Sequence, residues 1–259
     1  HLKLLDFYSV KVEFNLKDLE KDFFHAINMI KKINIIDSEV FLHNKIKSKV
    51  NILAEGAQGS LLDIDFGSYP YVTSSNTTAA GACTGLGIPP NQLNNVIGIF
   101  KAYSTRVGSG PFPTELSDPI GKKIAKVGNE FGSTTGRSRR CGWLDLVSLK
   151  YAVRINGINK LVMMKSDVLS GIKKIKICVG YEMDGKKIDY FPYSIEKNSV
   201  IPIYKEFEGW FQDLSKIENE NEFPVNFKKY LTYIEKELNI PISIISVGPN
   251  RKQTIFRNL

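Results

Sequence analysis

Arginine is concentrated in one short segment of this 259-residue chain. Arg137, Arg139 and Arg140 fall within four residues, in the run TTGRSRRCGWLD at 134–145, although the chain has only seven arginines against twenty-eight lysines. Guanidinium groups pair bidentately with carboxylates and phosphates, whereas an ammonium group acts mainly as a point charge. The Thr-Thr-Gly run adds hydroxyl donors and a backbone that can approach a ligand closely. The segment therefore indicates recognition of a planar anion, and a solvated basic turn is the alternative.

A second segment that could do chemistry reads Met-Lys-Ser-Asp at 164–167, directly after an apolar run. It resembles the [N/T]KxD guanine-specificity element of GTP-binding proteins, with Met164 in place of the usual Asn or Thr. The Asp167 carboxylate would accept hydrogen bonds from guanine N1–H and N2–H₂, while the Lys165 stem covers the ring. Adenine has an acceptor at N1 and no 2-amino group, so it would leave Asp167 unpaired. A surface Lys–Asp pair at the end of a strand is the alternative.

Five segments of the sequence together resemble one enzyme family. They are EGAQGSLLDIDFGSYPYVTSSNTT at 55–78, KAYSTRVGSGPFPTEL at 101–116, TTGRSRRCGWLD at 134–145, MKSDVL at 164–169 and SVGPNR at 246–251. In this order they are similar to the C-terminal part of the adenylosuccinate synthetases, from about Ile52 to Leu259. That family couples IMP to L-aspartate and uses GTP to phosphorylate the 6-oxygen of IMP.

The resemblance implies a binding role for each matching residue. It implies IMP binding by Gln58, Thr73, Val107 and Arg137. It implies aspartate binding by Ser133, Thr134, Thr135, Gly136, Arg137, Ser138 and Arg139. It implies GTP binding by Arg139, Lys165, Ser166, Asp167, Ser246, Val247 and Gly248. Taken singly, Gln58 could instead stabilise a turn, Thr73 could cap a helix and Val107 could pack in the core.

The family's Gly-rich phosphate loop, catalytic aspartate, general-acid histidine and metal ligands lie near its N-terminus. This sequence contains no Gly-Asp-Glu-Gly-Lys-Gly run and no Walker-type loop. The resemblance therefore implies that the catalytic residues and the Mg²⁺ ligands lie upstream, that none is in this chain, and that the chain alone is incomplete for catalysis. Asp63 and Asp65 could suggest a metal site, but we interpret them as residues that orient their loop.

Composition narrows the class of protein. The net charge of +8 admits nucleic acid as a partner, and an RNA-binding protein is one alternative, but the lysines are diffuse and form no block. No apolar run is long enough to span a bilayer. Cys83, Cys141 and Cys178 are odd in number and widely spaced, which argues against a disulfide framework or a zinc site. With the resemblance, we expect a cytoplasmic homodimer that binds neither nucleic acid nor membrane.

Hydrophobic periodicity predicts the elements that would position these residues. Apolar residues at three- and four-residue spacing predict a helix over 16–33, a second over 39–49 and another over 227–238. Short β-prone runs predict strands at 50–54, 96–100, 160–164, 175–181 and 242–246. The Asp-Gly turn within 183–186 predicts a hairpin with 187–191. The long Gly, Thr, Ser and Pro stretch at 67–90 is predicted to be a functional loop.

These elements predict an α/β fold. With the resemblance, we expect a P-loop-NTPase-like, mainly parallel central sheet flanked by helices, with a mainly helical N-terminal segment and a β-hairpin insertion. Residues 1–50 would be part of a helical insertion, and residues 51–259 the C-terminal part of a single catalytic domain. The function we favour is GTP-dependent ligation of IMP and L-aspartate to adenylosuccinate, and a non-catalytic GTP-binding module is the alternative.

Overall fold

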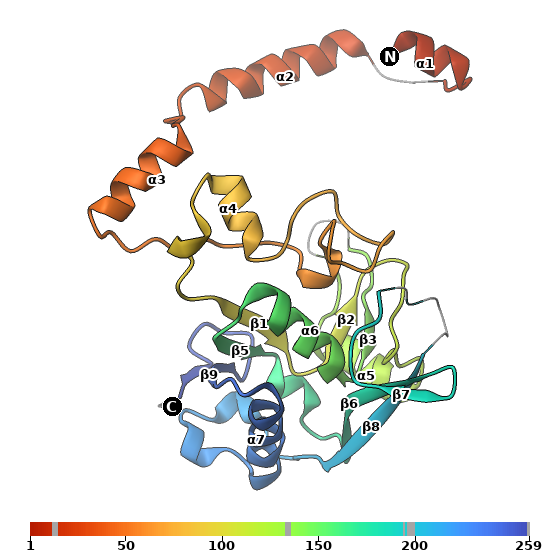
Figure 1. Ribbon diagram of the computed structural model, residues 1–259. Helices are drawn as coiled ribbons and strands as arrows, with labels where there is room; N and C mark the ends of the chain where they lie inside the picture. Colours follow the sequence, from red (N-terminus) through yellow and green to blue (C-terminus); the bar gives the residue numbers. More distant parts are fainter. Residues whose placement is uncertain (12–14, 133–135, 194, 196–199, 258–259) are drawn as a thin grey trace. The chain divides into compact units, whose positions relative to one another are not determined.

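A computed structural model describes residues 1–11, 15–132, 136–193, 195 and 200–257 (Figure 1). The chain divides into two compact units, His1–Ile52 and Leu53–Leu259, and each is described by itself. Among the described residues, no helix is long and apolar enough to cross a membrane.

The first unit consists of three helices, α1 (Leu2–Phe7), α2 (Leu16–Ile30) and α3 (Ser38–Lys47). The helices predicted at 16–33 and 39–49 are confirmed as α2 and α3, while α1 was not predicted. Asn15 begins α2, because its side-chain oxygen accepts the Lys17 N–H at 3.1 Å. No described residue of these three helices is buried.

The second unit contains a sheet of four strands in the order β1 (Ile97–Lys101), β5 (Lys160–Met164), β9 (Ile242–Ser246), β10 (Thr254–Phe256). The first three strands run parallel, and β10 is antiparallel to β9. Continuous apolar runs are typical of parallel strands, which is why the sequence predicts all three, although Ile97 and Ile99 of β1 are 49% and 72% exposed. The strands at 160–164 and 242–246 have the predicted bounds, and β1 is shifted by one residue.

A second sheet is formed by β4 (Leu144–Asp145), β6 (Lys174–Met183), β7 (Lys186–Ile188) and β8 (Ile201–Glu208). The predicted hairpin is confirmed, since β6 pairs antiparallel with β7 through a turn in which Asp184 and Gly185 both have positive φ. A separate pair joins β2 (Ser104–Arg106) to β3 (Arg140–Gly142). The unit is therefore an α/β fold, as the sequence predicts, and its sheets contain both parallel and antiparallel pairs.

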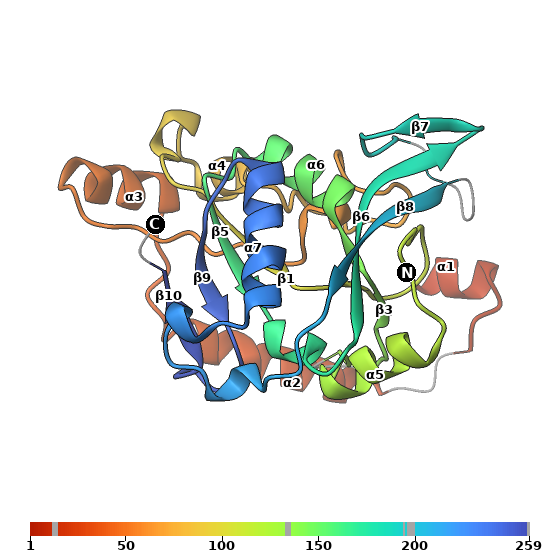
Figure 2. The ribbon, with the colours of Figure 1, turned by 90° about the horizontal axis from the view of Figure 1, so that it is seen from below.

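Helices complete this unit. They are α4 (Ala80–Leu86), α5 (Pro119–Val127), α6 (Leu146–Asn156) and α7 (Val225–Leu238), with short 3₁₀ turns η1 (Ser60–Leu62), η2 (Pro90–Gln92), η3 (Ser166–Leu169), η4 (Leu214–Lys216) and η5 (Glu220–Glu222). The predicted helix at 227–238 is confirmed as α7. Phe227 and Ile234 of α7 are buried in one core with Leu161 of β5 and Ile245 of β9, and Figure 2 shows the helix along these strands. The Tyr230 hydroxyl of α7 donates to the Ala102 carbonyl at 2.8 Å, which ties the helix to the end of β1.

The strand predicted at 50–54 is wrong. These residues form no regular element, and Val50 and Leu53 are 50% and 87% exposed. A β-prone run becomes a strand only where a neighbouring strand takes up its backbone groups, and no described segment pairs with it. The Gly-rich turn at 55–59 consequently does not follow a strand.

Asp145, which joins β4 to α6, is a buried carboxylate. Its two oxygens accept the Ser148 N–H at 3.1 Å and the Tyr181 hydroxyl at 2.6 Å. Burial raises the pKa of Asp145 to about 6, although both hydrogen bonds oppose that rise. The folded protein therefore holds this proton more tightly than the unfolded chain does, and stability falls as the pH rises toward 6.

We expect the difference in free energy of unfolding between the wild type and Asp145→Asn to change with pH. From pH 5 to pH 7 the wild type should lose about 1 kcal/mol relative to the variant. Chemical denaturation at several pH values measures the difference. Asp118→Asn is the matched control, because Asp118 also caps a helix, through the Gly121 N–H at 2.9 Å, but is exposed. A constant difference between wild type and Asp145→Asn across this range would contradict the prediction.

Candidate functional site

The candidate site lies where the parallel strands end. Because β1, β5 and β9 run in the same direction, their carboxyl ends meet at one edge of the sheet. This edge carries Lys101 at the end of β1, Lys165 directly after β5 and Ser246 at the end of β9. The carboxyl edge of a parallel sheet is where α/β proteins bind their ligands.

The structure brings the two segments predicted to bind guanine together. The Ser166 hydroxyl, fully buried, donates to the Ser246 carbonyl at 2.7 Å, and the Ser246 hydroxyl donates to the Gly248 carbonyl at 3.0 Å. The buried Val247 donates its N–H to the Gln253 carbonyl at 2.9 Å. The loop after β9 is thus fixed directly against the turn after β5.

Lys165 and Asp167 flank Ser166 in this turn. Lys165 has a φ of +59°, which reverses the chain at the end of β5. Asp167 is half-buried in the first turn of η3. Burial raises its pKa, while its own backbone N–H, the Lys165 charge and the Val168 N–H act in the opposite direction.

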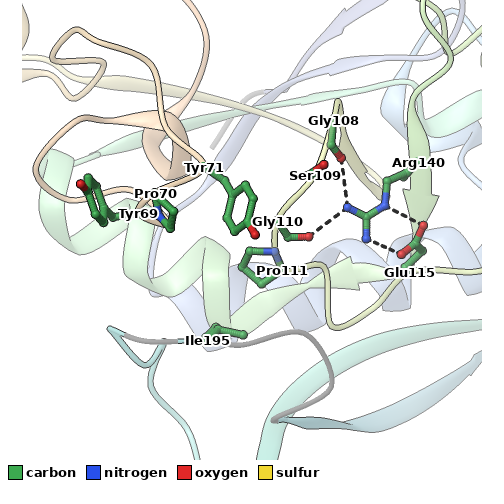
Figure 3. Close-up of a pocket in the computed structure, with 10 residues that line it drawn as sticks. All are labelled: Tyr69, Pro70, Tyr71, Gly108, Ser109, Gly110, Pro111, Glu115, Arg140 and Ile195. Atoms are coloured by element: carbon green, nitrogen blue, oxygen red, sulfur yellow. Dashed lines mark hydrogen bonds and ion pairs between the residues drawn. The ribbon is translucent and has the colours of Figure 1, made fainter.

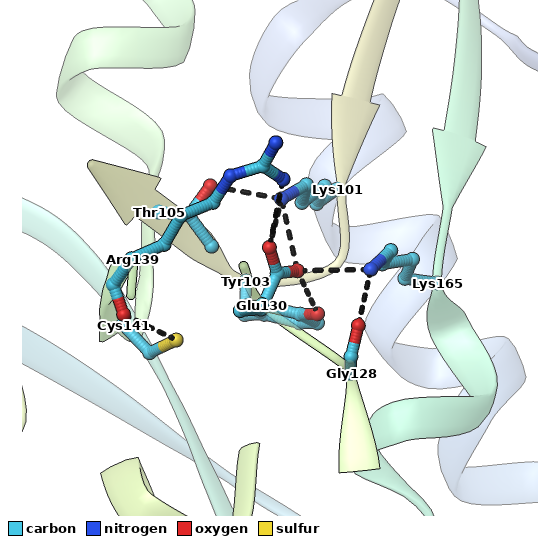
Figure 4. A network of polar contacts seen from close by, with 8 residues as sticks. All are labelled: Lys101, Tyr103, Thr105, Gly128, Glu130, Arg139, Cys141 and Lys165. Atoms are coloured by element: carbon cyan, nitrogen blue, oxygen red, sulfur yellow. Dashed lines mark hydrogen bonds and ion pairs between the residues drawn. The ribbon is translucent and has the colours of Figure 1, made fainter. Parts of the chain in front are cut away.

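A buried carboxylate, Glu130, gathers the cations around this edge (Figure 4). Lys101 donates to both of its oxygens at 2.9 Å, Arg139 to Oε2 at 3.0 Å and Lys165 to Oε1 at 3.1 Å. The Tyr103 hydroxyl donates to Oε1 at 2.5 Å, and the Glu130 side chain is 0% exposed. We name Lys101, Tyr103, Glu130, Arg139 and Lys165 the Glu130 cluster.

The charges of the Glu130 cluster do not balance. Three cations share one carboxylate, so two positive charges remain, and the cation side chains are 23–33% exposed. Burial alone would raise the pKa of Glu130, but the hydrogen bonds from Tyr103 and Lys101 and the lysine charge lower it to about 2. Burial lowers the pKa of Lys101, and Glu130 counteracts this. The cluster can therefore attract an anion from solvent while Glu130 stays ionised.

The three clustered arginines have different surroundings. Arg139 belongs to the Glu130 cluster. Arg140 faces the other way and pairs with Glu115, and it also donates to the carbonyls of Gly108 and Gly110 at 3.2 and 3.0 Å. Arg137 is exposed, and its guanidinium lies within about 4 Å of the space that a Cβ on Gly108 would occupy. Arg139 and Arg140 are therefore each paired with a different carboxylate, which the sequence pattern alone does not reveal.

The rest of the predicted aspartate loop is only partly described. Gly136 has a φ of +63° and donates its N–H to the Gly132 carbonyl at 2.8 Å, while Ser138 forms a β-bridge with Phe131. The predicted residues Ser133, Thr134 and Thr135 lie outside the described residues.

The residues predicted to bind IMP lie on three loops, of which the third is the arginine loop with Arg137. Gln58 is exposed with a φ of +62°, and the half-buried Thr73 donates its N–H to the Leu62 carbonyl at 2.8 Å. Val107 is 47% exposed beside Gly108, and so lies near Arg137. Arg106 joins the first two of these loops, since its two terminal guanidinium nitrogens donate to the Ser68 hydroxyl and the Tyr71 carbonyl, both at 3.1 Å.

Asp63 organises the first of these loops, as the sequence predicts. One carboxylate oxygen accepts the N–H groups of Asp65 and Phe66 at 2.9 and 3.0 Å. The other accepts those of Thr77 and Thr78 at 2.7 and 3.1 Å. Burial would raise the pKa of Asp63, but these four backbone bonds lower it. The carboxylate thus holds together two segments that flank Thr73.

We expect Asp63→Asn to lower the free energy of unfolding by about 2 kcal/mol, because an amide group would point its own N–H atoms at two backbone donors. Urea denaturation measures the loss. Asp65→Asn is the control, since the Asp65 side chain is exposed and accepts a hydrogen bond from the Asn76 amide at 2.8 Å. Equal effects of the two substitutions would refute the role of Asp63.

An open cavity of about 720 Å³ borders Arg140 (Figure 3). Tyr71, Gly108, Gly110, Glu115 and Arg140 are among its lining residues. Its rim carries the loop that follows Val107. Within the described part of the chain, none of the residues predicted to bind IMP, aspartate or GTP lines it.

The described residues contain no group of three or more His, Cys, Asp or Glu side chains that could hold a metal ion. Glu130 does not fit this role, because its oxygens already accept from three cations and a phenol. The three cysteines are thiols, and burial raises the pKa of Cys141, beside the cluster, to about 11.

Comparison with known proteins identifies the family. The adenylosuccinate synthetase family model matches residues 2–255. An adenylosuccinate synthetase of Flavobacterium johnsoniae is 60% identical over 257 residues, which are 99% of this chain and 61% of the relative. One from Bacteroides thetaiotaomicron is 56% identical over 249 residues, which are 96% of this chain and 59% of the relative. The chain belongs to the adenylosuccinate synthetase family.

A solved structure supports this membership of the adenylosuccinate synthetase family. The structure of fully ligated adenylosuccinate synthetase from Plasmodium falciparum is 41% identical, with a TM-score of 0.92, and the match covers 99% of this chain and 61% of that chain. This chain therefore spans 59–61% of the length of these adenylosuccinate synthetases.

Sequence reasoning missed two residues at the centre of the candidate site, Glu130 and Lys101. Lys101 follows the strand predicted at 96–100, so its place at a carboxyl edge was available as a signal. Glu130 had no comparable signal, because a single glutamate before the Arg-rich loop belongs to no motif.

Proposed function

We propose that this protein catalyses the GTP-dependent ligation of IMP and L-aspartate to adenylosuccinate. Family membership supports the proposal, together with the meeting of Arg139 and Lys165 on one buried carboxylate. That meeting is the observation that carries it, because it joins the arginine loop to the guanine-type turn at the carboxyl edge of the sheet.

Arg137 and Arg139 would bind the aspartate carboxylates, with Ser133, Thr134, Thr135, Gly136 and Ser138 as further donors along the loop. Planar guanidinium groups suit this task, and a hydrogen bond to a charged group is worth about 1.5–3 kcal/mol. Gln58, Thr73, Val107 and Arg137 would hold IMP. The proximity of Arg137 to Gly108, beside Val107, supports this shared position.

Guanine would bind between the turn after β5 and the loop after β9. Asp167 would accept from guanine N1–H and N2–H₂, the Lys165 stem would cover the ring, and Ser166 would hold the Ser246–Gly248 loop in place. Arg139 would reach both GTP and aspartate. In the reaction, GTP phosphorylates the 6-oxygen of IMP, the amino group of aspartate forms the new C–N bond at C6, and phosphate leaves with that oxygen.

The reaction also requires groups that bind phosphate. Mg²⁺ would neutralise the charge on the transferring phosphoryl group. We propose that its ligands and the catalytic residues belong to the part of the family's fold that this chain does not span. On the same grounds we propose a P-loop-NTPase-like sheet, a helical insertion at 1–50, the C-terminal part of one catalytic domain at 51–259, and a cytoplasmic homodimer.

Thermal unfolding in the presence of single ligands tests the proposal against a GTP-binding switch. We expect the intact protein to be stabilised by GTP and, with IMP present, further by L-aspartate. A ligand at 100 times its dissociation constant adds about 2.7 kcal/mol. Arg139→Lys should lose most of the aspartate effect. Stabilisation by GTP with none by aspartate would favour the switch and refute the ligase.

A further inference from the structure

Glu130 lies between segments that are far apart in the sequence. It follows α5 and meets Lys101 from β1, Arg139 from the arginine loop and Lys165 from the turn after β5 (Figure 4). Neither the resemblance nor the family match assigns it a role. Yet it contacts one cation from each of the two recognition elements, which makes it the physical connection between them.

The cations depend on this carboxylate for their positions. Arg and Lys side chains each lose about 2 kcal/mol of rotamer entropy when held in one place, and three like charges repel one another. Glu130 offsets both costs, because it is fully buried and ionised. Released from Glu130, Arg139 would return to a range of solvent-exposed rotamers, whereas Lys165 would keep the Gly128 carbonyl as a partner.

Glu130 is itself held rigidly. Tyr103 and Lys101 also donate to it, and Lys101 donates to the Thr105 hydroxyl at 2.9 Å as well. Gly128 approaches so closely that a Cβ there would lie 2.3 Å from the Tyr103 hydroxyl oxygen. The carboxylate therefore cannot turn to follow one cation without disturbing its bonds to the others.

We propose that Glu130 is a positioning residue that couples aspartate recognition to guanine recognition. Its Oε2 fixes Arg139 and its Oε1 fixes Lys165, so a ligand that orders one cation orders the other through the shared carboxylate. Such coupling is reciprocal: GTP favours aspartate by the same factor by which aspartate favours GTP. This role rests on the proposed ligase function.

Glu130→Gln in the intact protein tests the coupling. We expect the Michaelis constants for aspartate and for GTP each to rise about tenfold, and that for IMP to change less than about twofold. The matched control is Glu115→Gln, which weakens the carboxylate pair of the neighbouring Arg140 and should leave the aspartate and GTP constants unchanged. A merely structural role would shift all three constants alike.

A double-mutant cycle isolates the connection. We expect Lys165→Met, which changes the guanine side, to raise the aspartate Michaelis constant about threefold in the wild type and to add nothing to Glu130→Gln. An equal effect of Lys165→Met in both backgrounds would overturn the proposal, as would unchanged constants in Glu130→Gln. If Glu130→Gln does not fold, Glu130→Asp replaces it. This shorter acid cannot reach every cation, so both constants should rise about threefold, and unchanged constants would again refute the coupling.

The outcome also separates this proposal from the function on which it rests. A wild type that forms no adenylosuccinate would refute both. An active wild type whose Glu130 variants keep normal aspartate and GTP constants would refute the coupling alone.

Discussion

Arg137→Lys and Arg139→Lys are each expected to raise the Michaelis constant for L-aspartate by about 50-fold in the intact protein. Lysine keeps the positive charge but loses the planar pair of donors that a carboxylate accepts. Arg139→Lys would also weaken a second interaction, because the Arg139 guanidinium donates to the buried Glu130. Steady-state kinetics with aspartate as the varied substrate measure the change.

Arg140→Lys is the control for this pair. Its guanidinium bonds with Glu115 and the two glycine carbonyls, so the substitution should lower thermal stability and leave the aspartate constant within about twofold. Near-normal aspartate kinetics in both Arg137→Lys and Arg139→Lys would show that the loop has another purpose.

Asp167→Asn is expected to raise the Michaelis constant for GTP about 100-fold and to narrow its advantage over ATP. The carboxylate would accept two hydrogen bonds from guanine, whereas an amide offers one acceptor and turns its N–H₂ toward the second guanine donor. A buried donor left unpaired costs about 1–3 kcal/mol, in addition to the lost charge-assisted bond. Initial rates with GTP and with ATP measure both changes.

Asp213→Asn is the matched control for Asp167. Asp213 is a nearby carboxylate that caps η4 through the Ser215 N–H at 3.0 Å, and its side chain is 54% exposed. Its variant should keep the nucleotide preference. If the Michaelis constant for GTP and the preference for GTP over ATP are unchanged in Asp167→Asn, Lys165 and Asp167 form only a surface pair.

The parts of the fold that sequence predicts are those with local causes. The buried runs at 160–164 and 242–246 become β5 and β9 with the predicted bounds, because continuous apolar character is what a parallel strand requires. The run at 50–54 fails for the opposite reason: its β-propensity is local, but pairing depends on a partner strand, and no described segment supplies one.

The site divides in the same way. The Lys-Ser-Asp turn follows from its residues, since a guanine-type element after an apolar strand is a local pattern. The role proposed for Glu130 depends on β1, the arginine loop and the turn after β5 meeting in space, which no spacing along the chain encodes. The sequence places Arg140 beside Arg139 but does not show which carboxylate each one pairs with. Only the structure shows that Arg140 pairs with Glu115.

The most direct test of the ligase follows one oxygen atom. The intact protein is supplied with IMP labelled with ¹⁸O at the 6-position, L-aspartate, GTP and Mg²⁺, and the products are analysed by mass spectrometry. We expect adenylosuccinate to form only with GTP and aspartate present, and the label to appear in inorganic phosphate, because the phosphorylated 6-oxygen leaves with the phosphoryl group. GTP hydrolysis without adenylosuccinate, or label released into water, would contradict the function proposed for this protein.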